Sequence, residues 1–179
     1  CGRLSNEKNP GALLRAYHQL SDPDKVLLYV GDGRLRGELQ EFIDRDDVKS
    51  VYFTGFQDRS EVPKFYAIAD VLAVPSRREA TGMVVYEGMN FSIPVIVSDQ
   101  VGAGVDLVID GYNGYTFHEG NEEELADRLQ RILDMPDEAR QAMGERSRDL
   151  ISHWSDRDLS ESLVQYLSQI ISPKKRAGR

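Results

Sequence analysis

Two cations near the start of the chain and two carboxylates near its middle are the side chains best suited to chemistry. Arg3 and Lys8 lie five positions apart in a polar segment that follows Cys1-Gly2. If Cys1-Gly2 closes a strand, both cations follow its carboxyl end, where a guanidinium fork and an ammonium group can hold a diphosphate. The same residues also fit two solvated surface charges, and spacing alone favours that interpretation.

Glu79 and Glu87 lie on either side of Gly82, which follows a polar loop and precedes an apolar helical segment. The backbone N–H groups of Gly82, Met83 and Val84 would be free at the start of that helix and would form an anion site. Glu87 lies among apolar residues, and a half-buried carboxylate needs hydrogen-bond partners, which ligand hydroxyls can supply. A capping role for Glu79 and a salt bridge for Glu87 remain open alternatives.

The elements that would position these residues follow from alternating short apolar runs and helical stretches. The predicted strands are 26–30, 51–54, 71–74, 94–98 and 115–117. The predicted helices are 10–20, 35–45, 60–69, 83–91, one capped by Asn121 to about 133, one from Pro136 and one capped by Asp156. This order predicts an α/β fold, a Rossmann-like, doubly wound parallel sheet with helices on both faces. Ligands of such sheets bind beyond the carboxyl ends of the strands.

Composition narrows the possible partners. The chain has 179 residues, a formal net charge of −8 and a single cysteine, Cys1. The negative charge argues against a nucleic-acid partner, and the single cysteine favours a reducing, cytosolic compartment. The three histidines show no metal-ligand spacing and no apolar run is long enough to span a bilayer, so we expect neither a metal nor a membrane span. We predict one domain over residues 1–172, with a disordered tail over 173–179.

Seven short motifs in a fixed order make a more specific pattern than any of them alone. They are GRLxxEKN from residue 2, VGDGxLR from 30, TGF from 54, YxxADVxxxPS from 66, Glu79-x7-Glu87, PVIVSD from 94 and DGxNG from 110. In this combination the chain resembles, over residues 1 to about 155, the C-terminal, donor-binding half of the group 1 glycosyltransferases. These enzymes are retaining transferases of the glycogen-synthase-like GT-B fold.

The resemblance implies roles for the four charged residues. Arg3 and Lys8 match the cationic pair that grips the donor diphosphate and steadies the departing nucleotide. Glu79 matches the glutamate that contacts the transferred sugar, which gives a catalytic set of Arg3, Lys8 and Glu79. Glu87 matches the glutamate that accepts hydrogen bonds from the ribose hydroxyls.

The resemblance also implies a nucleotide-binding surface. The amides of Gly82, Met83 and Val84 match the phosphate-binding start of a helix, and Gly55 and Phe56 lie where the family cradles the base. The chain departs from the family pattern at Ala80-Thr81, which bears on the shape of the sugar pocket, and at Ser92, where a glycine is common.

The implied activity is transfer of a hexose, with retention, from a UDP-sugar or GDP-sugar to a saccharide or lipid-linked acceptor, as in cell-envelope polysaccharide synthesis. The donor is a substrate, and no cofactor or metal is expected. The chain lacks an initiator methionine and the family's N-terminal acceptor-binding domain, so we expect a fragment with little activity alone. The parent enzyme is expected in the cytoplasm, and a lipid-linked acceptor would make it peripheral at the inner membrane surface. The alternative is a non-catalytic nucleotide-binding or interaction module of the same fold.

Overall fold

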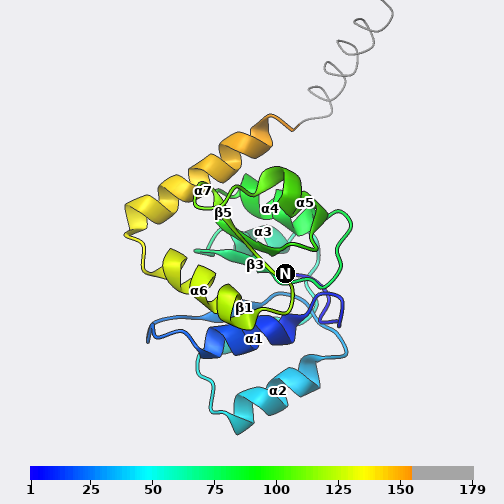
Figure 1. Cartoon of the computed structure of the whole chain (residues 1–179). Helices are drawn as coiled ribbons and strands as arrows, with labels where there is room; N and C mark the ends of the chain where they lie inside the picture. Colours follow the sequence, from blue (N-terminus) through cyan, green and yellow to red (C-terminus); the bar gives the residue numbers. More distant parts are fainter. Residues whose placement is uncertain (155–179) are drawn as a thin grey trace, which may run out of the picture.

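The computed structural model describes residues 1–154, in which seven helices and five strands alternate except for the last two helices, which follow one another. In chain order they are α1 (Pro10–His18), β1 (Leu27–Tyr29), α2 (Arg36–Arg45), β2 (Val51–Phe53), α3 (Val62–Tyr66), β3 (Leu72–Val74), α4 (Met83–Asn90), β4 (Val95–Ser98), α5 (Gly102–Leu107), β5 (Gly114–Phe117), α6 (Glu122–Leu133) and α7 (Asp137–Ser152) (Figure 1). The predicted helix capped by Asp156, the boundary at 172 and the tail at 173–179 lie outside the described residues.

All paired strands are parallel, as predicted. β1 pairs with β2, and β3, β4 and β5 pair in that order. The pairing forms two sheets, because β1 and β3 line opposite sides of a cavity of about 550 Å³ instead of bonding to each other. The segment that carries Arg3 lies at one end of this cavity, where Gly2 N–H donates to the Val30 carbonyl at 2.7 Å.

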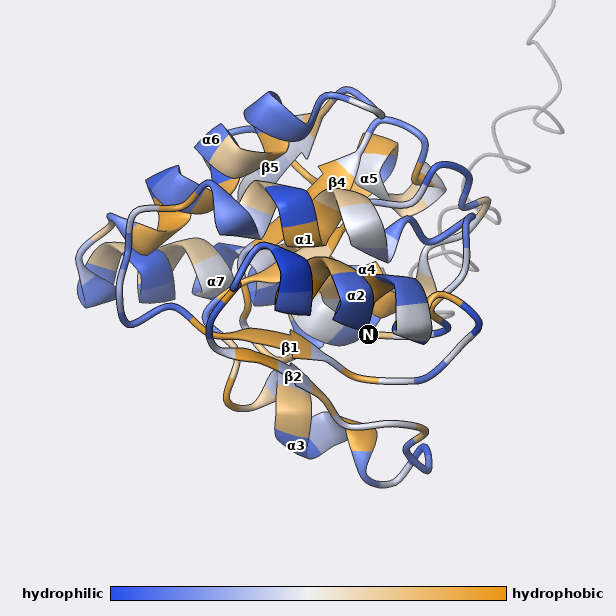
Figure 2. Cartoon of the chain, turned by 90° about the horizontal axis from the view of Figure 1, so that it is seen from below, coloured by the Kyte–Doolittle hydropathy of each residue, from blue (hydrophilic) through white to orange (hydrophobic). Residues whose placement is uncertain are grey.

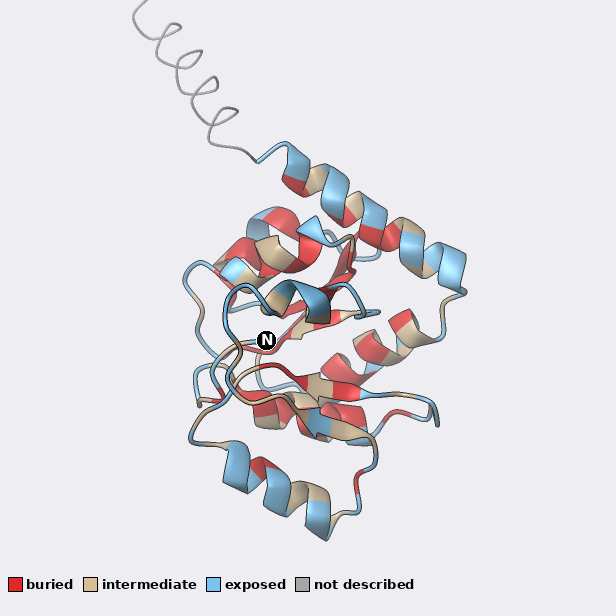
Figure 3. Ribbon diagram, turned by 180° about the vertical axis from the view of Figure 1, so that it is seen from behind, coloured by how far each residue is buried: buried red, intermediate tan, exposed pale blue. Residues whose placement is uncertain are grey.

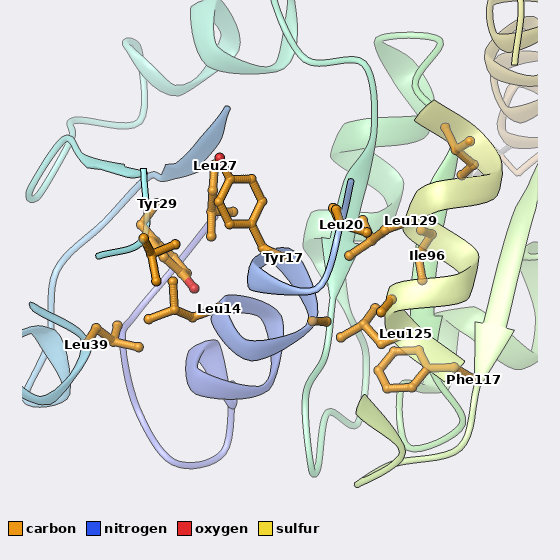
Figure 4. Packing of buried hydrophobic residues seen from close by; sticks show 14 of the residues in the cluster. Leu14, Tyr17, Leu20, Leu27, Tyr29, Leu39, Ile96, Phe117, Leu125 and Leu129 are labelled. Carbon is orange, nitrogen blue, oxygen red and sulfur yellow. The ribbon is translucent and has the colours of Figure 1, made fainter. Parts of the chain in front are cut away.

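Helices cover both faces of the β3–β4–β5 sheet, which confirms the predicted fold class. Side chains alternate along a strand, and β4 is buried on both sides. Ile96 packs into the cluster formed with α1 and α6, whereas Val95 and Val97 pack into the cluster formed with α3, α4, α5 and α7. Figure 4 shows Leu125 and Leu129 of α6 beside Ile96 and Phe117.

Burial and hydropathy follow this layering. Hydrophobic residues concentrate on the strands and on the helix sides that face them, whereas the outer helix turns are hydrophilic (Figure 2). In the α2 helix only Leu39 is fully buried, and most of its residues are exposed (Figure 3). No helix within residues 1–154 is both long enough and apolar enough to cross a bilayer.

Local sequence signals predicted the ends of most helices and strands to within about two residues, with two exceptions. The helix predicted over 60–69 was wrong in length, because only Val62–Tyr66 is α-helical. The α5 helix was not predicted, since Gly102–Leu107 contains two glycines and its N-cap residue, Val101, gives no side-chain cap. The predicted cap of α6 is confirmed, because the Asn121 side chain accepts a hydrogen bond from Glu124 N–H at 3.1 Å. Ser92 adopts φ 57°, a left-handed conformation that glycine adopts more readily than serine.

Candidate active site

Two glycines hold the Arg3 segment against the turn that follows β1. Leu4 N–H donates to the Asp32 carbonyl at 3.0 Å, and the Leu4 carbonyl accepts from Leu35 N–H at 3.2 Å. A Cβ on Gly33 would lie 2.7 Å from the Leu4 nitrogen, and one on Gly31 would overlap the Gly2 carbonyl. These glycines therefore serve a close backbone approach, which fixes Arg3 at the carboxyl end of β1. Its side chain is exposed.

Lys8 and Glu79 form an ion pair across 71 positions of sequence. The loop that carries Lys8 is bonded to the loop that carries Glu79, because Arg77 N–H donates to the Glu7 carbonyl at 2.8 Å. The side chains of Lys8 and Glu79 are 33% and 18% exposed, so the pair is partly shielded from water. The structure thus brings a predicted phosphate cation and the predicted sugar-contacting carboxylate together, with Lys8 Nζ donating to Glu79 Oε2.

The backbone around Glu79 is pinned by the segment that follows β4. Glu79 N–H donates to the Gln100 carbonyl at 3.1 Å, and the Glu79 carbonyl accepts from Gly102 N–H at 2.9 Å. Glu79 Oε1 also accepts from Gly82 N–H at 3.3 Å. Glu79 therefore caps the start of α4, the role that the sequence left open as an alternative, while its other oxygen pairs with Lys8.

The start of α4 offers further backbone donors next to this pair. Gly82, the N-cap residue, adopts φ 75°, which glycine tolerates best. Within residues 1–154 neither Met83 N–H nor Val84 N–H has an intramolecular acceptor, as expected for the first turn of a helix. The Met83 side chain is 56% exposed, and Val84 lines the same cavity as Arg3 and Lys8. Two amides and two cations at one end of the sheet can stabilise bound phosphate.

Glu87 lies just over one turn into α4, and its side chain is half-buried. Its Oε2 accepts a hydrogen bond from the Tyr66 hydroxyl at 2.7 Å. The sequence left a salt bridge open as an alternative role for Glu87, but Glu87 forms none within residues 1–154. Sequence reasoning missed Tyr66 as a site residue. The sequence showed it only as the first residue of the YxxADVxxxPS motif, with no role attached.

Gly55 and Phe56 lie in the loop after β2. Gly55 adopts φ 70° and forms a bridge with Gly31, which in turn packs against Gly2. The Phe56 side chain is 80% exposed. The structure therefore places an exposed aromatic ring on the loop next to the Arg3 segment, although no contact joins it to Glu79 or Glu87.

The cavity between β1 and β3 is larger than this site. Most of its lining is apolar, including Leu27 and Leu72. Charged residues line both ends: Arg3 and Lys8 lie near the carboxyl ends of the strands, whereas Asp22, Asp24, Lys25, Asp70 and Arg140 lie towards the amino ends of β1 and β3. Ser76, which also lines the cavity, is buried, and its hydroxyl has no partner within the described residues. We place the site at the end that carries Arg3 and Lys8, because ligands of parallel sheets bind beyond the carboxyl ends of the strands. No group of three His, Cys, Asp or Glu side chains within residues 1–154 is arranged to hold a metal ion.

Comparison with known proteins points to one family. The model of the family described as "Glycosyl transferases group 1" matches residues 1–150. An uncharacterized glycosyltransferase of Methanocaldococcus jannaschii is 32% identical over 76% of this chain and 38% of its own length. The alpha-D-kanosaminyltransferase of Streptomyces kanamyceticus is 30% identical over 83% of this chain and 39% of its own length. The chain thus spans less than two fifths of these relatives.

Solved structures agree with the sequence comparison. The crystal structure of Anabaena HepE in complex with UDP superposes with a TM-score of 0.81 and 26% identity, and covers 94% of this chain and 47% of that one. A second HepE crystal structure, with UDP-glucose, superposes with a TM-score of 0.79. The fold of residues 1–154 is therefore shared with proteins that bind a nucleotide or a nucleotide sugar.

Proposed function

The chain belongs to the group 1 glycosyltransferases, and from that membership we propose that it binds a nucleotide-diphosphate sugar whose sugar is transferred to an acceptor. The observation that carries the proposal is the cluster of Lys8, Glu79 and the free amides at the start of α4, beside Arg3. This cluster offers positive charge for a diphosphate and a carboxylate for sugar hydroxyls.

Each group then has a task in the reaction. As the bond between sugar and diphosphate breaks, negative charge grows on the leaving phosphate oxygen. Arg3, Lys8 and the amides of Met83 and Val84 stabilise that charge, which lowers the barrier more than it strengthens ground-state binding. Glu79 orients the sugar, and Glu87 accepts hydrogen bonds from the ribose. Phe56 provides an apolar face for the base.

The finer features of the proposal rest on family resemblance. They are transfer of a hexose with retention, a saccharide or lipid-linked acceptor held by a separate N-terminal domain, a role in cell-envelope polysaccharide synthesis and a cytoplasmic location, peripheral to the membrane. The proposal includes no metal requirement, because two fixed cations offer the charge that a metal would otherwise supply. Nucleotide binding should then be equal with Mg²⁺ and with EDTA.

A calorimetric titration of the chain with UDP, GDP, ADP and their glucose conjugates tests donor binding. One nucleotide family should bind, and ligand at about 100 times its Kd should stabilise the fold by about 2.7 kcal/mol. Lys8→Ala should weaken that binding about tenfold or more, because a charge-assisted contact is worth about 1.5–3 kcal/mol. Lys49→Ala is the matched control, since Lys49 forms a solvent-exposed ion pair with Asp47. Absence of binding by every nucleotide would refute the proposal for this chain.

A further inference from the structure

The side chain of Glu87 has one partner within residues 1–154, and that partner is a buried phenol. Tyr66 is 5% exposed, and its hydroxyl lies 2.7 Å from Glu87 Oε2. The two residues come from different helices, because Tyr66 ends α3 and Glu87 lies within α4. The contact therefore depends on how the two helices pack.

The Tyr66 ring is held independently of its hydroxyl. It packs in the apolar cluster that contains Leu72, Val85 and Met89. It also stacks on Phe91, with ring centroids 5.6 Å apart and an angle of 28° between the planes. A ring fixed on these sides can direct its hydroxyl to one place only, and that place is the Glu87 carboxylate.

The hydroxyl can act only as a donor towards Glu87. Burial, followed by the hydrogen bond to the Glu87 carboxylate, raises the pKa of Tyr66 well above its ordinary value. The phenol therefore stays protonated at neutral pH, while an ionised carboxylate only accepts. One oxygen of Glu87 is thus held in place, and its other oxygen keeps its full accepting capacity.

We propose that Tyr66 is a positioning residue, which fixes the Glu87 carboxylate so that it accepts hydrogen bonds from the two adjacent ribose hydroxyls of the nucleotide. This inference rests on the proposed function. A glutamate has several rotatable bonds, and their freedom must be lost when the carboxylate engages a ligand. Tyr66 removes that freedom in the unliganded protein, and preorganisation of this kind raises affinity. It also makes Tyr66 a determinant of ribose specificity.

The location of Tyr66 supports this role over a purely structural one. Tyr66 lines the same cavity as Arg3, Lys8 and Val84, so the carboxylate that it holds lies in the element that starts the candidate phosphate site. A bond needed only to join α3 to α4 would not require a half-buried charged acceptor, because the stack on Phe91 already joins the two segments.

The test is the discrimination between a ribonucleotide and its 2′,3′-dideoxy analogue, measured by calorimetry on the 179-residue chain. The ribonucleotide is whichever of UDP, GDP and ADP binds the unmodified chain. Tyr66→Phe keeps the ring and removes the hydroxyl. We expect this variant to bind the ribonucleotide about tenfold more weakly, equivalent to about 1.4 kcal/mol, and to bind the dideoxy analogue unchanged. The preference for ribose should shrink by the same factor.

Two further variants separate positioning from packing. Tyr52→Phe is the matched control, since Tyr52 is 57% exposed on β2, and it should change neither affinity. Phe91→Leu removes the stack but leaves the Tyr66 hydroxyl and the apolar cluster around its ring, and it should lower the unfolding temperature while the preference for ribose persists. A Tyr66→Phe chain that keeps its preference, or one that loses affinity for both ligands equally, overturns the inference and leaves nucleotide binding intact. Failure of the unmodified chain to bind any nucleotide overturns both proposals.

Discussion

Replacing Gly33 by alanine should destabilise the chain by about 2–4 kcal/mol. The new Cβ would lie 2.7 Å from the Leu4 nitrogen and 2.8 Å from its carbonyl carbon, and closer still to its oxygen. These are backbone atoms, so no side-chain rotation relieves the overlap. Overpacking of this kind costs about 1–3 kcal/mol. The segment must also retreat from its bonds to Asp32 and Leu35, each worth about 1 kcal/mol.

Urea unfolding followed by circular dichroism measures this loss, and the melting temperature should fall by roughly 5–15 °C for a chain of this size. Gly37→Ala is the matched control, because Gly37 lies within α2 with nothing within 4 Å of its added Cβ. The control should stabilise the chain by up to about 1 kcal/mol through helix propensity. The same chemical change thus has opposite signs at the two sites. A Gly33→Ala chain as stable as the unmodified one would refute the close-approach explanation.

Three other substitutions test separate features. Glu79→Gln should tighten UDP binding several-fold, because it releases Lys8 from its ion pair. The gain for UDP-glucose should be smaller, because the carboxylate that contacts the sugar is lost. Equal gains for both ligands in calorimetry would contradict the sugar contact. Asn121→Ala should cost about 1 kcal/mol in urea unfolding, since it removes the acceptor for Glu124 N–H; an unchanged midpoint would exclude the cap. The hydrogen bond to Glu124 raises the pKa of His118 in the folded chain. The protonated histidine therefore stabilises the fold fully below about pH 6.5, and this stabilisation is lost as the pH rises through the raised pKa. The difference in unfolding free energy between the unmodified chain and His118→Gln should therefore be larger at about pH 6 than at about pH 8. A larger difference at about pH 8 would refute a raised pKa of His118 in the folded chain.

Local signals were sufficient for most of the secondary structure. The apolar runs at β1 to β4 end at turn-forming residues. The cap at Asn121 can be recognised from the side chains of Asn121 and of the first turn that follows it. Such features depend on neighbours a few residues away. The α5 helix could not be predicted in this way, because its first turn is held by Ala103 N–H donating to the Thr81 carbonyl, a contact with a distant loop.

For the candidate site too, the sequence predicted some features and missed others. Because parallel strands present their carboxyl ends at one edge, the order of the elements was sufficient to predict that Arg3, Lys8, Glu79 and Glu87 belong to one region. It was also sufficient to nominate the start of α4 as an anion site. The sequence did not reveal that Glu79 is already engaged by Lys8, or that the turn at Gly31-Asp32-Gly33 serves a backbone approach.

The sequence by itself determined the type and order of the elements other than α5, the family and the set of charged residues. Only the tertiary structure decided which of those residues touch. Lys8 and Glu79 are 71 positions apart, and Tyr66 and Glu87 are 21 apart. Contacts over such separations depend on how helices pack on a sheet, which is set by the shapes of many buried side chains together. No periodicity or spacing within one segment encodes that arrangement, and the tyrosine that holds Glu87 becomes visible only when α3 and α4 are brought together.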